Sequence, residues 1–226
     1  MGLLRHESER VNRMRDMAPV QVSRTYAEVM GSAASSYDWA VRRIARYRPV
    51  ADSILDVGTG PGFLPPRLAR AYPEAHVTGI DTGPEMLAIA REKAEAEGLS
   101  DRMSYVDASA YEIPFADATF DLVVATSAIH GFDDLEAFFQ EARRVLVEGG
   151  HFVVIDQRRD VFWPVYGLMW ASTLGLRLAR KPIDGMGPVI DACYTRGEVE
   201  ETLARAGFAG WDVSAGILTL VASATA

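Results

Sequence analysis

Three glycines at alternate positions follow a short apolar run, and their spacing is suited to holding a ligand. Residues 54–57 form the run, and Gly58, Gly60 and Gly62 come directly after it. Because glycine lacks a Cβ, the backbone there can turn sharply and let a ligand approach closely. Such a turn between a strand and a helix also exposes backbone N–H groups. The pattern predicts a binding loop, but alone it fits dinucleotides, nucleosides and tight packing equally.

Acidic residues stand at the ends of three successive predicted strands. Asp56 ends the strand before the glycines, Asp81 follows residues 76–80, and Asp107 follows residues 103–106. A carboxylate at the second strand end can accept from both hydroxyls of a ribose. One at the third could accept from an exocyclic amine. The carboxyl ends of parallel strands form the edge where open α/β sheets bind ligands, so three acids there favour a cationic or neutral nucleoside over a pyrophosphate.

With these motifs, the chain resembles the class I S-adenosylmethionine-dependent methyltransferases, in particular the small-molecule, methyltransferase type 11-like group. The resemblance rests on residues 56–62, on Asp81, on Asp107 with Ala108, on the strand 120–125, and on residues 143–146 before Gly149 and Gly150. It is close over residues 35–156 and looser near the C-terminus. It implies S-adenosyl-L-methionine as cofactor and S-adenosyl-L-homocysteine as product.

The resemblance also implies roles for individual residues. The glycine loop would pass under the methionine part of the cofactor, Asp81 would hold the ribose, and Asp107 would meet the adenine amine. Met86 would pack near the adenosine, and the residues after the fourth strand would contact the amino-acid end. The expected cofactor residues are Asp56, Gly58, Thr59, Gly60, Gly62, Asp81, Thr82, Met86, Asp107, Ala108, Thr126 and Ser127.

Alternating strand and helix patterns predict an α/β fold. Together with the resemblance, they indicate a Rossmann-like, doubly wound, mostly parallel seven-stranded sheet with a C-terminal antiparallel hairpin, in three α/β/α layers. Helices are expected at residues 35–47, from Thr82 as capping residue to Glu97, and from Thr195, with Glu198 as the second start signal, to Gly207. A further helix is expected from Asp133 until Gly149 ends it, and its residues expected to face the sheet are Leu135, Phe138, Phe139, Ala142 and Val145. Strands are expected at residues 152–155, 211–214 and 217–222.

Two prolines depart from the expected pattern just after the glycine loop. Pro65 and Pro66 stand where the first core helix should begin. A residue before proline is biased away from the α region, so Leu64 is expected to be extended or distorted. Proline is tolerated in a first helical turn. The helix is therefore expected to begin a few residues late.

A single domain of residues 1–226 is expected, with four parts. These are N-terminal helices or a lid (1–48), a cofactor-binding core (49–156), a cap insertion (157–194), and a C-terminal helix with its hairpin (195–226). The insertion is far longer than the roughly 2 to 6 residues usual for such connections. Its uncharged, aromatic centre at residues 161–176 is too short to span a membrane.

The favoured interpretation of the insertion is a cap that excludes water from a small apolar or aromatic acceptor. A surface for a membrane or a second subunit, and hence a possible homodimer, is the alternative. The candidate pocket residues are Tyr26, Tyr37, Trp163, Tyr166 and Trp170.

His130 is the candidate catalytic residue, because it follows the fourth strand and should lie at the ligand edge. It would act either as a general base or as an orienting group. No cluster of ligands with close spacing suggests a metal. One cysteine, Cys193, a net charge of −8 and the absence of an N-terminal apolar run favour a cytoplasmic protein without a nucleic-acid partner.

Three alternatives remain open from the sequence. A nicotinamide-dependent oxidoreductase would place its third glycine where Phe63 stands. A non-catalytic S-adenosylmethionine-binding protein could use the same fold, since a fold does not guarantee activity. A transferase of an aminopropyl group would need acids for a polyamine, and the insertion supplies few.

Overall fold

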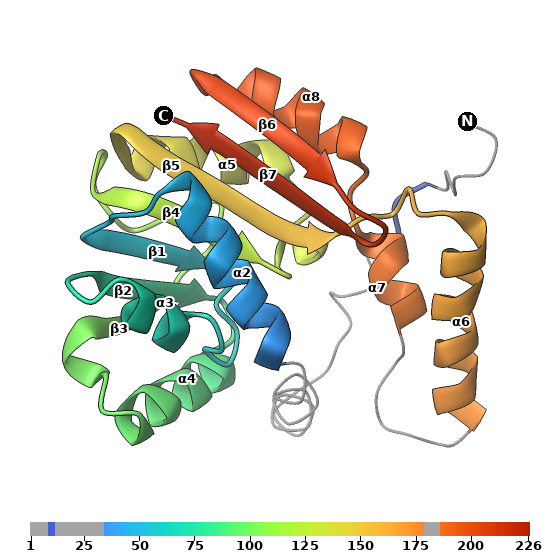
Figure 1. The fold of residues 1–226 in the computed structure, drawn as a ribbon, viewed down its shortest axis with the longest axis horizontal. Helices are drawn as coiled ribbons and strands as arrows, with labels where there is room; N and C mark the ends of the chain where they lie inside the picture. The colour runs from blue at the N-terminus through green and yellow to red at the C-terminus, as the bar shows by residue number, and fades with distance from the viewer. Residues whose placement is uncertain (1–8, 12–33, 179–185) are drawn as a thin grey trace.

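A seven-stranded sheet forms the centre of the computed structural model, which describes residues 9–11, 34–178 and 186–226 (Figure 1). The strands are β1 (Ser53–Val57), β2 (His76–Asp81), β3 (Met103–Asp107), β4 (Phe120–Thr126), β5 (Leu146–Gln157), β6 (Gly210–Ala215) and β7 (Thr219–Thr225). The described helices are α2 (Ala34–Tyr47), α3 (Pro65–Ala71), α4 (Pro84–Ala96), α5 (Leu135–Val145), α6 (Trp163–Leu178), α7 (Met186–Ala192) and α8 (Arg196–Ala206), with short 3₁₀ turns η3 (Ser100–Arg102) and η4 (Ile129–Gly131).

The strand order is β3-β2-β1-β4-β5-β7-β6, and β7 pairs antiparallel with both of its neighbours. The other pairs are parallel. From β1 the chain runs outward to β2 and β3, and then returns to β4 on the other side of β1. The direction of winding therefore changes between β1 and β4, and open α/β sheets bind ligands at such a switch point. The predicted fold class is confirmed.

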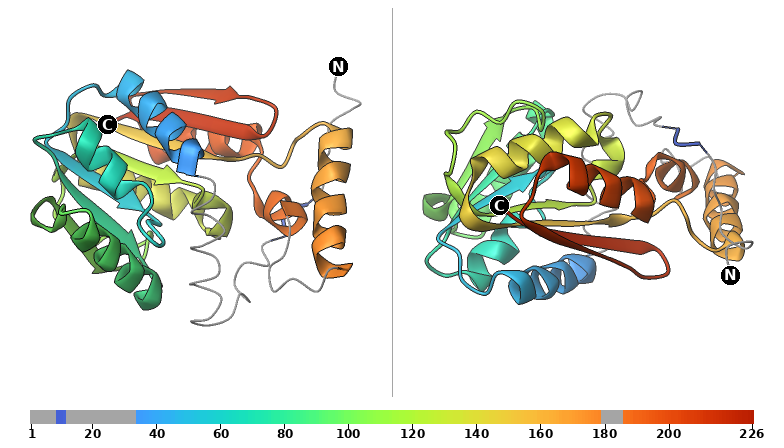
Figure 2. Two further views of the ribbon diagram at one scale, coloured as in Figure 1. Left: turned by 60° about the horizontal axis from the view of Figure 1, so that its bottom comes forward. Right: turned by 90° about the horizontal axis from the view of Figure 1, so that it is seen from above.

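Helices cover both faces of the sheet, as the view from above in Figure 2 shows. One face packs against α2, α3 and α4, and the other against α5 and α8. Alternate strand residues point to opposite faces of the sheet. Ile54 belongs to the core on the side of α2, α3 and α4, and Leu55 belongs to the core on the side of α5 and α8. The predicted inward face of α5 is confirmed, since Leu135, Phe138, Phe139, Ala142 and Val145 are all buried.

Local capping signals explain several helix ends. Thr195 and Glu198 form the predicted capping box of α8, and Gly207 ends that helix with a left-handed φ of 78°. The predicted cap of α4 was wrong, because Gly83 is the N-cap and no side chain caps it. Instead, Asp81 Oδ1 accepts a hydrogen bond from the Gly83 N–H at 2.9 Å. The helix start is thereby tied to a predicted ligand-binding acid.

The expectation for Leu64 was also wrong. Leu64 has helical angles, φ −80° and ψ −45°, and α3 begins immediately at Pro65. The two prolines occupy the first helical positions, where an N–H would lack an intrahelical partner anyway. Leu64 is itself buried at 2% exposure. Tertiary packing therefore outweighs the local bias of a residue before proline.

Strand β5 begins at Leu146, well before the predicted residue 152, so α5 ends at Val145 rather than at Gly149. Gly149 has a left-handed φ of 71° and donates its N–H to the Ala226 carbonyl at 3.1 Å. This glycine is therefore used within the long strand and does not terminate the helix.

The predicted insertion contains α6 and α7, which pack against each other beside the sheet, with α7 between α6 and the strand ends (Figure 1). Within the described part of the chain, no helix has the length and apolar character needed to cross a membrane.

Candidate active site

The glycine loop after β1 is fixed to the neighbouring strand. The N–H groups of Gly58 and Thr59 both donate to the Ile80 carbonyl, at 2.9 and 3.0 Å. Gly58, Gly60 and Gly62 all have positive φ. An added Cβ would lie 2.6 Å from the Ala128 Cβ at Gly58 and 2.7 Å from the Ala90 Cβ at Gly62, whereas at Gly60 it would meet nothing within 4 Å.

The three glycines therefore serve different purposes. Gly58 and Gly62 are required by packing against neighbouring elements, in addition to their backbone conformation. Gly60 borders open space, where a ligand could lie directly against the backbone.

Asp81 joins this loop to the start of α4. Its Oδ2 accepts from the Gly60 N–H at 2.8 Å, and its Oδ1 accepts from the Gly83 N–H. Burial raises the pKa of Asp81 above its usual range, although these backbone donors act in the opposite direction. Asp81 also pairs in register with Asp107 of β3. The two predicted nucleoside-binding acids thus lie side by side at the same strand edge.

A small cavity of about 60 Å³ opens beside Asp81. It is lined by Val57, Gly58, Ile80, Asp81, Thr82, Ala108, Ala110 and Phe132. Four of the predicted cofactor residues, namely Gly58, Asp81, Thr82 and Ala108, are among these. Phe132 and the apolar strand residues had no local sequence signal that distinguished them from ordinary core.

The remaining predicted cofactor residues lie around the same edge. Asp107 is exposed at the end of β3, and Met86 is half-buried in the first turn of α4. Thr126 ends β4, and Ser127 follows with a left-handed φ of 51°. The Ser127 N–H donates to the Ile155 carbonyl at 2.8 Å, which fixes the turn to β5.

A buried polar group lies beneath the glycine loop. Asp56 is 2% exposed, and burial raises its pKa to about 7, against a smaller opposing effect of the nearby Thr59 hydroxyl. The buried oxygens without a hydrogen-bond partner among the described residues include Asp56 Oδ2, Thr59 Oγ1, the Tyr105 hydroxyl and Thr126 Oγ1. Unpaired buried polar atoms are rare in native proteins. Those here, and the buried acid in particular, fit a site for a polar, positively charged ligand such as S-adenosylmethionine.

His130 lies in η4, after β4, and its ring is almost fully buried. Its Nδ1 lies 3.0 and 3.1 Å from the two carboxylate oxygens of Asp156 at the end of β5, and its backbone N–H donates to Asp156 Oδ2 at 3.2 Å. Burial acts to lower the pKa of His130, but the Asp156 charge and hydrogen bond outweigh it, so the pKa lies above its usual value. The geometry fits a base whose orientation is fixed by a carboxylate.

Arg10 connects the His130 segment to α7. Its guanidinium donates to the carbonyls of Ala192 at 2.7 Å, His130 at 3.0 Å and Phe132 at 2.6 Å. It also lies over the Tyr194 ring, 4.2 Å from the centroid. Neither Arg10 nor Asp156 was predicted from the sequence. Arg10 lies 120 residues from His130, a separation at which no periodic pattern indicates a contact.

His130, Asp156 and Cys193 bring potential metal-ligand atoms within 4.8 Å of one another. Two guanidinium groups stand beside this cluster: Arg10 donates to the Ala192 carbonyl and Arg159 to the Cys193 carbonyl at 2.6 Å. Burial raises the pKa of the Cys193 thiol far above its usual range. A neutral thiol beside two fixed cations is a poor cation site, because metal ligation needs the thiolate. The expectation of no metal stays a prediction.

The predicted acceptor residues fall into two places. Tyr37 packs against Phe63 next to the glycine loop, with ring centroids 5.5 Å apart. Trp163, Tyr166 and Trp170 belong to α6, where the Tyr166 hydroxyl donates to Asp191 of α7 at 3.1 Å. Tyr26 lies outside the described residues. The assignment of all five to an acceptor pocket stays a prediction.

Comparison with known proteins points to one family. Residues 55–154 match the profile of the family described as "Methyltransferase domain". A demethylmenaquinone methyltransferase of Thermus thermophilus is 45% identical over 103 residues, which are 46% of this chain and 46% of the relative. A demethylmenaquinone methyltransferase of Bacteroides fragilis is 28% identical over 211 residues, covering 89% of this chain and 85% of the relative.

The fold similarity extends to solved structures. A SAM-dependent methyltransferase from Aquifex aeolicus superposes with a TM-score of 0.58 at 24% identity, covering 76% of this chain and 81% of the other. By contrast, the match to the Thermus relative spans only about half of that relative's length.

Proposed function

We propose that this chain is a class I S-adenosylmethionine-dependent methyltransferase, and that it methylates a small, largely apolar acceptor of the quinone type in its reduced form. One observation carries the proposal: the glycine loop with Asp81 and the buried His130–Asp156 pair lie at the same strand edge, on opposite sides of the switch point between β1 and β4.

The chain's own groups hold the donor. Asp81 accepts the ribose hydroxyls while its backbone hydrogen bonds keep the carboxylate in place. Gly60 leaves room for the methionine part, and the buried Asp56 carboxyl favours positive charge above it. When bound, S-adenosylmethionine supplies a methyl group on a positively charged sulfur. The protein's remaining tasks are to align the acceptor, exclude water and manage one proton.

His130 takes that proton. Hydrogen bonding of Nδ1 to Asp156 leaves the ring lone pair on Nε2, and the raised pKa makes the ring a stronger base. Deprotonation of a phenolic hydroxyl on a reduced quinone increases electron density on the ring carbons, where the methyl group would attach as its bond to sulfur breaks. That ring carbon would then lose its hydrogen as a proton and the oxygen would regain one, so that one proton is released overall. Asp156 is a positioning residue, because it acts through His130.

The acceptor class is supported by the relatives' names and by the apolar surroundings of the site. Both relatives described above are named for methylation of demethylmenaquinone. Phe132, on the cavity wall, packs edge-on against Phe138 and Tyr111, with ring centroids 5.0 and 6.1 Å away. Such a wall suits an aromatic ring and keeps water away from it.

The test is incubation with S-adenosylmethionine and a short-chain 1,4-naphthoquinol unsubstituted at one ring carbon. Release of S-adenosylhomocysteine, with a product heavier by one methylene group, is the expected result. The Asp81→Asn variant should bind S-adenosylhomocysteine about tenfold or more weakly, because hydrogen bonds to a charged group contribute ~1.5–3 kcal/mol, whereas the exposed-acid control Asp101→Asn should bind normally.

The outcomes separate the alternatives. Binding of S-adenosylhomocysteine without turnover of the naphthoquinol or of phenolic and amine acceptors would favour a non-catalytic binding protein. Binding of NAD(H) in its place would favour an oxidoreductase. The cytoplasmic location, the absence of a nucleic-acid partner, the homodimer and the four-part division of the chain stay predictions.

A further inference from the structure

Helix α6 exposes apolar residues on its outer face, while its inner face packs on α7 through Trp170 and Thr173. Thr173 is fully buried and accepts from the Gly187 N–H of α7 at 3.0 Å, while Tyr166 reaches Asp191. The opposite stripe, at intervals of three and four residues, consists of Pro164, Leu168, Ala171, Gly175 and Leu178, and all five are exposed. A surface helix of a globular protein shows the reverse arrangement.

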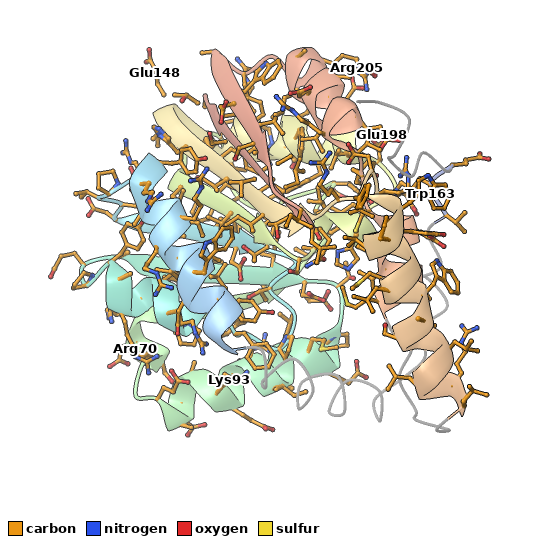
Figure 3. The ribbon with its side chains drawn as sticks, turned by 45° about the vertical axis from the view of Figure 1, so that its right-hand side comes forward. Arg70, Lys93, Glu148, Trp163, Glu198 and Arg205 are labelled. Atoms are coloured by element: carbon orange, nitrogen blue, oxygen red, sulfur yellow. The ribbon has the colours of Figure 1, made fainter. Side chains whose placement is uncertain are left out.

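The exposure on the outer side is extensive. Leu168, Leu174 and Leu178 are 63%, 59% and 77% exposed, and Trp163 is 49% exposed. Figure 3 shows Trp163 at the start of the helix. A groove of about 310 Å³ runs along the flank of the helix beside Trp170, Leu174 and Arg177. Contiguous apolar surface of this kind marks an interaction site.

The charge pattern selects the partner. The chain has 31 acidic residues, yet none falls in residues 161–183, where Arg177, Arg180 and Lys181 occur. An apolar helix whose only charged residue is an arginine in its last turn, followed by a cationic run, is complementary to an anionic lipid surface. At about 24 Å, from 1.5 Å per residue, α6 is too short to cross a bilayer but can lie along its surface.

The position of α6 connects this surface to the active site. It follows β5, which ends beside Asp156, and it packs on α7, whose Ala192 shares Arg10 with His130. We propose that α6 lies flat on an anionic lipid bilayer, with Leu168, Leu174 and Leu178 among the acyl chains, and so presents the active site to an apolar acceptor dissolved there. The idea that the acceptor comes from the bilayer rests on the proposed function, whereas the contact of α6 with lipid does not.

Flotation with phosphatidylcholine vesicles, with and without phosphatidylglycerol, tests the proposal. The wild-type protein should bind the anionic vesicles and bind the neutral ones more weakly. Leu168→Glu with Leu174→Glu should lower the partition coefficient about 100-fold or more, because the two substitutions remove apolar surface from the acyl chains and add negative charge. Arg177→Gln should lower it about fivefold. The control Ile217→Glu changes an exposed aliphatic residue between β6 and β7, and this variant should bind like wild type.

Several results would overturn the lipid contact. These are no binding of wild type to anionic vesicles, unchanged binding of the double variant, or equal loss in Ile217→Glu. A lipid-free dimer that the double variant dissociates would instead identify α6 as a contact between two copies of the chain.

Failure of this proposal can be distinguished from failure of the proposed function. The double variant should keep its affinity for S-adenosylhomocysteine and its turnover of a short-chain naphthoquinol within about twofold, because Leu168 and Leu174 lie away from the glycine loop and His130. If the double variant loses vesicle binding but keeps its turnover, the result supports the lipid contact and leaves the proposed function untouched. If the wild-type protein binds anionic vesicles but does not turn over the naphthoquinol, the result contradicts the proposed acceptor and leaves the lipid contact untouched.

Discussion

The chemistry of the His130–Asp156 pair depends directly on pH. Asp156 raises the pKa of His130 above 6.5 despite burial of the ring. A raised histidine pKa means that the protonated form stabilises the fold below the unfolded value, and that this contribution is lost as pH rises through the folded value. Catalysis has the opposite requirement, because only the neutral ring can accept a proton.

Turnover should therefore increase with pH through an ionisation above 6.5. Asp156→Asn should move this ionisation to lower pH and reduce kcat about 10- to 100-fold, because the orienting carboxylate is lost. His130→Gln should remove the ionisation from the profile altogether. The measurement is kcat as a function of pH for the three proteins. An unchanged profile in His130→Gln would exclude the base assignment.

Asp56 makes a second pH-dependent contribution to stability, and it has the same direction as that of His130. Its pKa is raised from 3.8 to about 7, so the folded protein binds more protons than the unfolded chain between these values. The stability contributed by this group therefore falls as pH rises from about 4 to 7 and stays low above.

The nearly isosteric Asp56→Asn variant should lack this dependence. Without ligand, it should be more stable than wild type at pH 8 by up to about 4 kcal/mol, since one pKa unit corresponds to ~1.4 kcal/mol. The advantage should shrink towards pH 4. Thermal unfolding across this range measures it, with Asp101→Asn as the exposed control. Parallel curves for wild type and Asp56→Asn would contradict the assignment.

At the scale of elements, Arg10 holds three segments together. Its guanidinium bonds to η4, to the residue after η4 and to the end of α7, and the Tyr194 hydroxyl bonds to the same Phe132 carbonyl at 2.6 Å. Phe132, on the wall of the small cavity beside Asp81, and the candidate base are thereby fixed by a residue far away in the sequence.

Arg10→Gln should lower the free energy of unfolding by about 2 kcal/mol, because carbonyls in a partly buried site lose charged donors. Urea unfolding should show a lower midpoint with an unchanged slope. The matched variant Arg42→Gln, on the exposed side of α2, should stay within about 0.5 kcal/mol of wild type. Equal effects of the two substitutions would show that the Arg10 contacts are unimportant.

At the scale of the whole molecule, the sequence predicted those features that depend on neighbouring residues or on a periodic pattern. The Thr195–Glu198 capping box, the buried face of α5 and the apolar runs of β1 and β4 each require only neighbouring residues. Contacts between distant residues gave no such signal. Asp156 appeared to be an ordinary strand end, Arg10 an ordinary charged residue, and the outward orientation of α6 depends on where α7 packs.

Ligand binding should stabilise the whole fold, because the glycine loop, the start of α4 and the strand edge are the elements that we propose contact the ligand together. S-adenosylhomocysteine at 100 times its Kd should add about 2.7 kcal/mol. For a chain of this size that corresponds to a rise in Tm of about 5 to 10 °C. Differential scanning fluorimetry measures the shift, with NAD as the unrelated dinucleotide control. A larger shift with NAD would contradict the donor assignment.

The open space at Gly60 offers a way to prevent ligand binding without disturbing the fold. Alanine at Gly58 or Gly62 would collide with neighbouring elements and disturb the structure itself, whereas alanine at Gly60 meets only the region reserved for the ligand. Apart from a modest backbone strain of ~1 kcal/mol at its positive φ, Gly60→Ala should leave the architecture intact. Such a chain would be folded yet empty, and any role that persisted in it would not depend on methylation.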